Sequence, residues 1–314
     1  MGHHGESVVP TLAVAERRHV TGQEAITSIA LAYELSIKVV NSVGGTLGSL
    51  AKRGWTPETI VAPCIMALIA GRLLGLNEEQ MANALAIAGS FNLEVGVLHS
   101  GQEEIPMARN LRYPYGAYNG IFGALTAQKG FKGPLRIFEG HNGLAQVVAG
   151  GEMDLEVLRQ PRKDWAILNT WIKNFSTEGR MHGHIEGTLT LVKKYDIKPE
   201  DVAQVRIKTN SHTFTKMGNP ETRRFAKTKF TADHSSYYTT AIAIVDRTMG
   251  PEQFSDEKMH DPRVQELLGK IFVEPDPALD PYASAGTVAI TTKKGEEYYL
   301  EVFEPKGHPM NPMT

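Results

Sequence analysis

Apolar residues recur every three or four positions through the first half of the chain, which is the spacing of an amphipathic helix. The first such segment opens with the capping box Thr21-Gly-Gln-Glu24, whose side chains bond the first turn of a helix. The apolar positions behind this box are Ile26, Ile29, Tyr33, Ile37 and Val40. The pattern therefore predicts an amphipathic helix that begins at this box.

Three further helices are predicted in the same half. Pro57 suits the first turn of a helix that ends at Gly75, and Asn77 with Gln80 forms a second capping box. The helix behind Asn77 carries a face of small residues that permits close helix contacts (Ala82, Ala84, Ala86 and Ala88). A fourth helical pattern covers about residues 115–129. The first half is therefore predicted to be an all-α domain.

The pattern changes near residue 165. Residues 202–209 alternate between apolar and polar side chains, as in a half-buried strand, and 288–292 with 298–303 predict a β-hairpin. Helical patterns separate these strands at 183–195, 234–249 and 262–271. Helices that alternate with few strands predict an α+β domain. The fold class expected is mainly α, with a large helical domain and a smaller α+β domain.

Composition narrows the function classes. The chain has 314 residues, of which 41% are apolar and 22% charged, as in a globular protein of about two domains. Its 33 Lys and Arg against 35 Asp and Glu give no basic excess, so we expect no nucleic-acid partner. A single cysteine, Cys64, excludes an intramolecular disulfide and an iron–sulfur cluster held by several thiolates of one chain.

Neither a membrane span nor a signal peptide is predicted. The longest apolar stretch, 60–70, is too short to cross a bilayer, and no charged segment followed by an apolar one opens the chain. We therefore expect a cytoplasmic protein without a membrane partner. The phosphate loop, the GxSxG elbow and the HExxH zinc helix are absent from the sequence. Gly44, Gly45 and Gly48 follow a helical pattern and not a strand, which argues against a nucleotide loop.

Polar and charged residues concentrate in four segments. These are residues 2–6, residues 100–115 (with Glu103, Glu104, Arg109 and Arg112), residues 173–184 and residues 227–238. Each has an ordinary structural alternative. His182 and His184 are either a metal pair or plain surface or helix-start residues, and the second interpretation is favoured because no Cys or Asp lies nearby. These segments alone indicate a two-domain enzyme that binds an anion.

Two other features have similar alternatives. The basic residues of 216–229 form either an anion site or a solvated loop. Asp233 precedes a helical pattern, where a carboxylate caps the helix and interacts with its dipole. Periodicity and charge alone do not decide whether these residues have a functional or only a structural role.

The same segments resemble the 2-methylcitrate dehydratase (MmgE/PrpD) family, which includes cis-aconitate decarboxylase. The resemblance lies in LLGLNEEQMANALAIAGS at 73–90 and NGIFGALTAQKGFKGPLRIFEGHNG at 119–143. It continues in TADHSSYYTTAIAIVDR at 231–247 and KGHPMNPMT at 306–314. The resemblance implies a cofactor-independent enzyme, with no metal, that acts on a small-molecule polycarboxylate.

The family also implies a domain plan. It predicts a partial helical domain over 1–168, an α+β lid over 169–306, and a return segment over 307–314 that leads back towards the helical domain, with the active site between the domains. Family members carry helices before and after this stretch, so the chain is expected to be truncated at both ends. We accordingly expect a homodimer, or a partner chain that supplies the missing helices.

Several site residues follow from the resemblance. His3 corresponds to the histidine of the family's GHPSD motif, with Glu6 in place of the aspartate. Lys173 corresponds to the lysine at the start of the lid, His234 lies in the ADHS motif, and Tyr238 corresponds to an active-site tyrosine after it.

Four positions depart from the family pattern. Thr56 stands in place of a histidine or aspartate, Arg109 replaces a pocket lysine, Arg180 falls where relatives have a histidine, and Ser176 replaces a proline. We keep Thr56, Arg109 and Arg180 as substrate-binding candidates together with His234. These changes preserve cationic character and leave the substrate open.

The implied reaction is the dehydration of 2-methylcitrate or a related tricarboxylate to an alkene of the cis-aconitate type. A proton beside a carboxylate is removed, which requires cations to neutralise that carboxylate, and Arg109, Lys173 and Arg180 suit this purpose. His3 is the expected proton carrier, and Tyr238 either protonates the departing hydroxyl or positions the substrate. Decarboxylation, epimerisation and an inactive, truncated binding protein remain alternatives.

Overall fold

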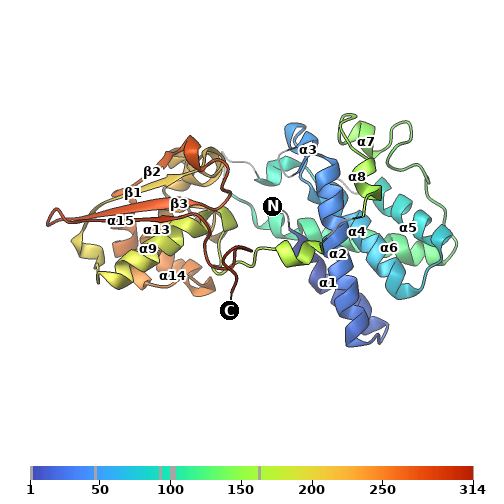
Figure 1. Ribbon diagram of the computed structural model, residues 1–314, viewed down its shortest axis with the longest axis horizontal. Helices are drawn as coiled ribbons and strands as arrows, with labels where there is room; N and C mark the ends of the chain where they lie inside the picture. Colours follow the sequence, from blue (N-terminus) through green and yellow to red (C-terminus); the bar gives the residue numbers. More distant parts are fainter. Residues whose placement is uncertain (1–2, 46–47, 92–93, 100–103, 162–163, 314) are drawn as a thin grey trace. The chain divides into compact units, whose positions relative to one another are not determined.

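The computed structural model describes residues 3–45, 48–91, 94–99, 104–161 and 164–313. The chain forms two compact units (Figure 1). The first contains Met1–His99 and Ala108–Asn169, and the second contains Ser100–Met107 and Thr170–Thr314. The sequence-based boundary at 168/169 did not anticipate that the segment before Ala108 groups with the second unit. Each unit is described by itself below.

The first unit is helical. Its principal elements are η1 (His4–Ser7), α1 (Val8–Arg17), α2 (Gly22–Ser42), α3 (Ser49–Lys52), α4 (Glu58–Leu74), α5 (Glu78–Ser90), η3 (Met107–Leu111) and α6 (Arg112–Gln128). The short α7 (Leu144–Val147), α8 (Glu156–Arg159) and η4 (Ala166–Asn169) follow. Two predicted caps are confirmed, because the Thr21 hydroxyl accepts from the Glu24 N–H and Asn77 forms a complete capping box with Gln80.

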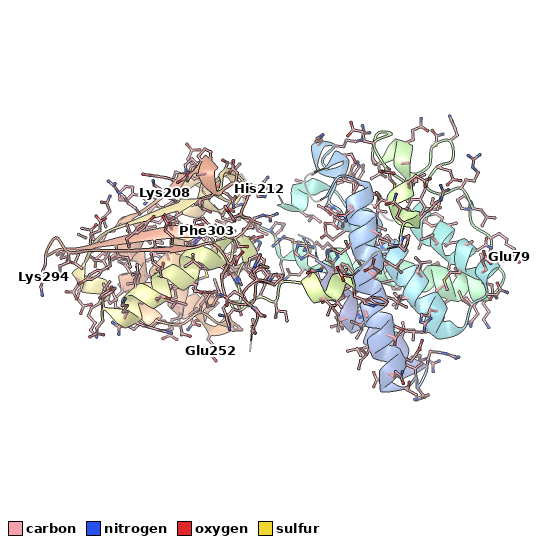
Figure 2. All side chains as sticks on the ribbon, in the orientation of Figure 1. Glu79, Lys208, His212, Glu252, Lys294 and Phe303 are labelled. Carbon is pink, nitrogen blue, oxygen red and sulfur yellow. The ribbon has the colours of Figure 1, made fainter. Side chains whose placement is uncertain are left out.

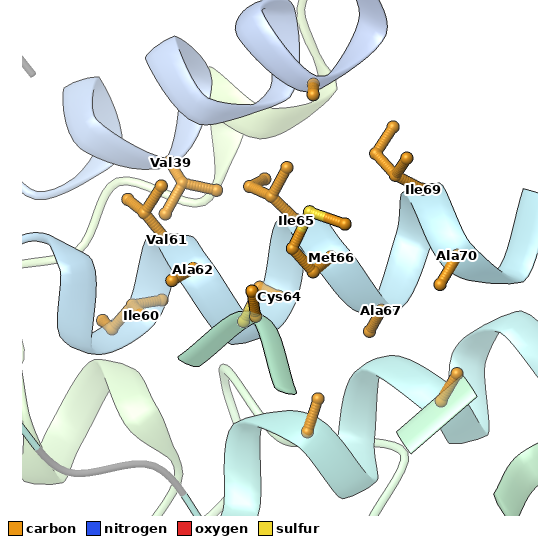
Figure 3. Close-up of a cluster of buried hydrophobic side chains, with 14 of the residues drawn as sticks. Val39, Ile60, Val61, Ala62, Cys64, Ile65, Met66, Ala67, Ile69 and Ala70 are labelled. Carbon is orange, nitrogen blue, oxygen red and sulfur yellow. The ribbon is translucent and has the colours of Figure 1, made fainter. Parts of the chain in front are cut away.

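Helix α4 is the centre of this unit. Its side chains are buried on nearly every side, which explains its continuous apolar sequence (Figure 3). The helix ends, as predicted, at Gly75, which adopts the left-handed conformation at φ 74°. Helix α6 packs against α4 and α5 through glycines. A Cβ on Gly120 would lie 2.5 Å from the Pro63 carbonyl oxygen, and one on Gly123 would lie 2.7 Å from the Ala84 carbonyl oxygen.

The second unit is α+β. Its longer helices are α9 (His182–Lys194), α13 (Ser236–Asp246) and α15 (Pro262–Leu268). Shorter turns are η5 (Gly179–Met181), α10 (Ser211–Thr213), η7 (Phe214–Gly218), α11 (Pro220–Arg223), α12 (Lys229–Ala232) and α14 (Asp256–Met259). The strands are β1 (Val202–Thr209), β2 (Ile271–Pro275), β3 (Gly286–Thr292) and β4 (Glu297–Val302).

The four strands form one mixed sheet in the order β2-β1-β3-β4. β1 is parallel to β2, with Val205 opposite Ile271, and antiparallel to β3; β3 and β4 form the predicted hairpin. Helices α9 and α13 cover one face, where Val205 and Ile207 are fully buried (Figure 1). Arg206 and Lys208 alternate with them and are exposed, as the strand pattern requires. Strand β2 was not predicted.

These two units confirm the predicted fold class of a helical domain followed by an α+β domain. None of the helices in the described parts of the chain combines the length and the apolar character that a membrane crossing requires.

Candidate functional site

A cluster of cationic side chains surrounds one carboxylate in the second unit. Glu178 precedes η5 and acts as its N-cap, because its Oε2 accepts the Arg180 backbone N–H at 2.6 Å. The Arg180 Nη1 donates to Glu178 Oε1 at 3.1 Å. The two side chains retain only 14% (Glu178) and 17% (Arg180) of their exposure. Arg180 is therefore held in place by a partly buried ion pair.

The ADHS segment is joined to this cluster through the backbone. The Glu178 N–H donates to the Asp233 carbonyl oxygen at 3.0 Å. The His234 Nδ1 contacts the Asp233 carboxylate, so a carboxylate orients this imidazole. The prediction that Asp233 caps the following helix is wrong, because Ser235 is the N-cap of α13 and Asp233 ends the short α12. The aspartate side chain instead faces His234.

The charges around Glu178 decide the direction in which its pKa is shifted. Burial alone would raise the pKa of this carboxyl, but the nearby charges of Arg180, His234 and Lys173 outweigh burial and lower its pKa. His212, on α10, also belongs to this neighbourhood (labelled in Figure 2). Burial lowers its pKa, and the Arg180 charge lowers it further. The structure thus brings Lys173, Arg180 and His234 together around Glu178, and it adds a histidine that the sequence did not single out.

Tyr238 is placed differently. Its hydroxyl is buried and donates to the Gln253 carbonyl oxygen at 2.5 Å. Burial raises its pKa, and the charges that act on it are those of Asp246 and Asp261. These contacts hold α13 against the η8 turn (Pro251–Phe254) and differ from those of the Glu178 cluster. The proposed role of Tyr238 in proton transfer gains no support from them.

A second cluster lies in the helical unit at the start of the described chain. The His3 Nδ1 lies 3.2 Å from Glu6 Oε1, and its Nε2 lies 4.0 Å from Glu58 Oε1. The Arg112 Nη2 donates to the same Glu6 oxygen at 3.3 Å. Burial would raise the pKa of Glu6, but His3 and Arg112 outweigh it and lower the pKa. His3 itself remains 39% exposed, so its imidazole is both oriented by a carboxylate and accessible to solvent.

The other predicted site residues of this unit, Thr56 and Arg109, lie on other segments of the helical unit. Thr56 is buried next to Pro57, two residues before Glu58. Arg109 lies on η3 and is partly buried. His4 is buried beside Tyr33, and burial lowers its pKa to about 4. The first unit therefore assembles His3 with Glu6, Glu58 and Arg112.

The polar segment at 100–115 contains two acidic residues, Glu103 and Glu104. Glu103 lies outside the described residues. Glu104 accepts hydrogen bonds from the Lys227 N–H at 3.2 Å and from the Thr228 hydroxyl at 3.0 Å. The Ile105 N–H donates to the Thr231 hydroxyl at 2.9 Å. These bonds attach the segment before Ala108 to the second unit, and Glu104 has a structural role there.

Comparison with known proteins identifies the family. The model of the MmgE/PrpD N-terminal domain matches residues 1–156, and that of the MmgE/PrpD C-terminal domain matches residues 175–314. The chain belongs to the MmgE/PrpD family. The cis-aconitate decarboxylase-like protein oryM of Aspergillus oryzae is 26% identical over 56% of the chain and 37% of its own length. The cis-aconitate decarboxylase of Aspergillus terreus is 23% identical over 97% of the chain and 66% of its own length.

The chain therefore spans between about one third and two thirds of the length of these relatives. The two matched MmgE/PrpD domains correspond to the helical unit and to the α+β unit. The stretch between the two matches, residues 157–174, contains the boundary after Asn169. The two divisions agree at this boundary and differ for Ser100–Met107, which lies within the N-terminal match but groups with the second unit.

Two sequence-based alternatives for this MmgE/PrpD chain need correction. His182 and His184 are completely buried, so they are not surface residues. The His182 ring contacts Trp171 and Phe175 edge-on, with centroids 5.3 and 5.1 Å apart. No group of three or more His, Cys, Asp or Glu residues in the described part of the chain could hold a metal ion.

Part of the basic stretch at 216–229 is buried, so this stretch is not simply a solvated loop. Arg223 is buried, and its Nε donates to the Lys216 carbonyl oxygen at 2.8 Å. The Arg224 guanidinium donates to the carbonyl oxygens of Leu268 and Ile271 and lies over the Tyr237 ring. These two arginines are structural.

Proposed function

We propose that this MmgE/PrpD protein is a cofactor-independent lyase that dehydrates 2-methylcitrate or a related tricarboxylate to an alkene of the cis-aconitate type. The observation that carries the proposal is the cluster of Lys173, Arg180 and His234 around Glu178. Lys173 and Arg180 are permanent cations. The Glu178 carboxylate pairs with Arg180 and the Asp233 carboxylate with His234, while the Lys173 ammonium is exposed. A substrate carboxylate is the ligand that such a cluster attracts.

Lys173 is the better candidate for direct substrate contact. Arg180 is already engaged by Glu178 through its side chain and its backbone, whereas Lys173 is exposed and acts on Glu178 through its charge alone. We propose that the Lys173 ammonium neutralises the carboxylate beside the carbon that loses its proton. The Arg180–Glu178 pair keeps the surrounding backbone in position.

His3 is the proposed proton carrier. Its Nδ1 faces the Glu6 carboxylate, an arrangement that favours the tautomer with the proton on Nδ1 and leaves the Nε2 lone pair to accept a proton. In the proposed reaction a C–H bond breaks, its electron pair forms the C=C bond, and the neighbouring C–O bond breaks as the hydroxyl leaves with a proton as water. Neutralising the adjacent carboxylate lowers the barrier to the first of these changes.

Decarboxylation is the second candidate, and the similarity to a cis-aconitate decarboxylase and to a cis-aconitate decarboxylase-like protein favours it. In that reaction a C–C bond breaks and carbon dioxide leaves, the bonding electron pair stays on carbon as a similarly stabilised carbanion, and a proton is then added to that carbon. Epimerisation would return the proton to the opposite face, and an inactive chain would only bind the acid. At 23–26% identity the reaction does not transfer from relative to chain.

The purified chain should be incubated with 2-methylcitrate, citrate and cis-aconitate, with alkene formation followed by absorbance and carbon dioxide by trapping. Alkene without carbon dioxide supports dehydration, and carbon dioxide from cis-aconitate supports the second candidate.

Calorimetry measures the binding of these acids in a separate experiment. Lys173→Met should abolish most tricarboxylate affinity, while Lys208→Met, on the exposed face of β1, should leave it unchanged. Equal loss in both variants, or no binding by the parent chain, would reject the proposal.

A further inference from the structure

Lys173 lies on a segment that is neither helix nor strand. Residues 170–178 precede η5, and Lys173 is exposed near the middle of this stretch. A segment without regular hydrogen bonds opens easily unless side-chain contacts hold it. The proposed function requires the Lys173 ammonium at one place, so the contacts on either side of it determine how well this site is ordered.

Two aromatic side chains flank Lys173 and converge on one ring. The Trp171 ring meets the His182 imidazole edge-on, with centroids 5.3 Å apart and an interplanar angle of 80°. The Phe175 ring meets the same imidazole with centroids 5.1 Å apart and an angle of 62°. Edge-to-face contacts at these separations are a preferred arrangement of aromatic rings. We call Trp171, Phe175 and His182 the aromatic clamp, because it holds the chain two residues before and two residues after Lys173.

His182 is anchored in the core of the α+β unit. It is the first residue of α9, a helix that packs against β3, β4 and α13 (Figure 1). Its side chain is completely buried. The next residue, Gly183, donates its N–H to the Ser284 carbonyl oxygen at 3.0 Å, and a Cβ on Gly183 would lie only 2.3 Å from that oxygen. The beginning of α9 is therefore a fixed point, and the aromatic clamp joins the Lys173 segment to it.

The Lys173 side chain lies against Gly179. A Cβ added to Gly179 would be 3.7 Å from Lys173 Cε and 3.4 Å from the Trp171 ring. The Lys173 stem and the Trp171 ring thus share the space beside a residue that has no side chain. From this position the Lys173 charge helps to lower the pKa of Glu178. The ring contacts of Trp171 therefore bear directly on where the Lys173 ammonium lies.

The His182 imidazole acts in the aromatic clamp as a neutral ring. Burial, and after it the charge of Lys173, lowers the pKa of His182 to about 4. At neutral pH His182 therefore adds no positive charge beside Lys173. A ring without nitrogen atoms can replace it if packing is its function, whereas such a ring cannot replace a proton carrier.

We propose that His182 is a positioning residue for Lys173: its ring holds Trp171 and Phe175 and thereby fixes the Lys173 ammonium where a substrate carboxylate binds. This inference rests on the proposed function for the role of Lys173. It assigns His182 itself no contact with the substrate. Removal of the ring should release residues 170–178 and leave the rest of the α+β unit folded.

Limited proteolysis with trypsin measures how firmly the segment is held, whether or not the chain is active. Mass spectrometry gives the rate of cleavage after Lys173 relative to cleavage after Lys294, an exposed residue between β3 and β4 (labelled in Figure 2). At pH 7.5 His182→Leu should raise this ratio by about tenfold or more, because two aromatic contacts are lost. His182→Phe keeps a ring and should stay near the parent ratio.

Two further variants complete the proteolysis experiment. His184→Leu is the matched control, because it makes the same substitution at a completely buried residue of α9 two positions further on, and it should leave the ratio unchanged. Trp171→Leu opens the aromatic clamp from its partly exposed side, so it gives the same test if His182→Leu does not fold. An unchanged ratio in the folded clamp variants, or equal acceleration at both bonds, would overturn the proposal.

Calorimetry with 2-methylcitrate and citrate tests the consequence for binding. His182→Leu should raise the Kd by about tenfold, since a misplaced ammonium loses its contact with the substrate, and His182→Phe should restore most of the affinity. A released segment with an unchanged Kd, or equal losses in His182→Leu and His182→Phe, would overturn the proposal. A parent chain that binds neither acid refutes the proposed function instead, and the cleavage ratio then decides alone whether the aromatic clamp fixes Lys173.

Discussion

Acid should weaken the α+β unit through two completely buried histidines, His182 and His184. Burial lowers the pKa of His182 to about 4 and that of His184 to about 3, against an ordinary value of 6.5. Below pH 6.5 the unfolded chain therefore binds protons that the folded chain does not, and the free energy of unfolding falls. Integrated from pH 7.5 to pH 5.0, the loss is about 2 kcal/mol for each histidine, or about 4 kcal/mol for the pair.

The variant His184→Leu isolates one of these contributions. His184 is completely buried, and its ring nitrogens have no hydrogen-bond partner among the described residues, so leucine fits without breaking a bond. Between pH 7.5 and pH 5.0 the variant should lose about 2 kcal/mol less than the parent. Carboxyl groups with lowered pKa values, such as that of Glu178, lose their stabilising charge only at lower pH and do not obscure this window.

Urea unfolding followed by tryptophan fluorescence measures this difference. Trp171 contacts the His182 ring, so a background of Trp55→Phe and Trp165→Phe makes the signal specific to the second unit. His260→Gln is the control, because His260 is exposed on the same unit. The same pH dependence in His184→Leu and in the parent would refute the reasoning, since it would show that His184 is protonated in the folded state.

Three other predictions follow from the structure. Gly120→Ala should destabilise the helical unit by about 1–3 kcal/mol in thermal unfolding, because its Cβ would meet backbone atoms of α4; Gly22→Ala, which has open space around it, should not. His3→Gln should lower kcat about 10²–10⁴-fold without changing stability, and an unchanged kcat would remove His3 from the mechanism. Activity should survive EDTA, and loss that is restored by a divalent metal would contradict a metal-free reaction.

The sequence was most informative where local chemistry decides structure. The Asn77 capping box and the Gly75 helix end depend on side chains close together in the chain, and both were predictable. Strand β2 was not predictable, because it has only five residues, ends in Pro275 and is separated from α15 by two residues, so neither alternation nor length distinguishes a strand. Its pairing with β1, more than sixty residues away, is a tertiary effect that no local pattern encodes.

The candidate site shows the same limit. The polar segment at 173–184 was recognised, but the sequence did not reveal that Glu178 neutralises Arg180 or that His212 joins them. Tyr238 is another instance. Helix α13 is buried on nearly all sides, so its sequence has no polar face from which the direction of the Tyr238 hydroxyl could be inferred.

The role of Arg180 is the sharpest case in which structure changes an expectation. From the sequence, Arg180→Ala should weaken tricarboxylate binding far more than it affects stability. The structure shows that this variant would also leave a Glu178 carboxylate, only 14% exposed, without its guanidinium partner, at a cost of about 1–3 kcal/mol. We therefore expect Arg180→Ala to lower stability in urea unfolding and Glu178→Gln to restore most of it in the double variant. Lys173→Ala, by contrast, should weaken tricarboxylate binding and leave the stability unchanged. If Arg180→Ala instead keeps full stability while losing affinity, Arg180 binds the substrate directly and the pair with Glu178 is dispensable.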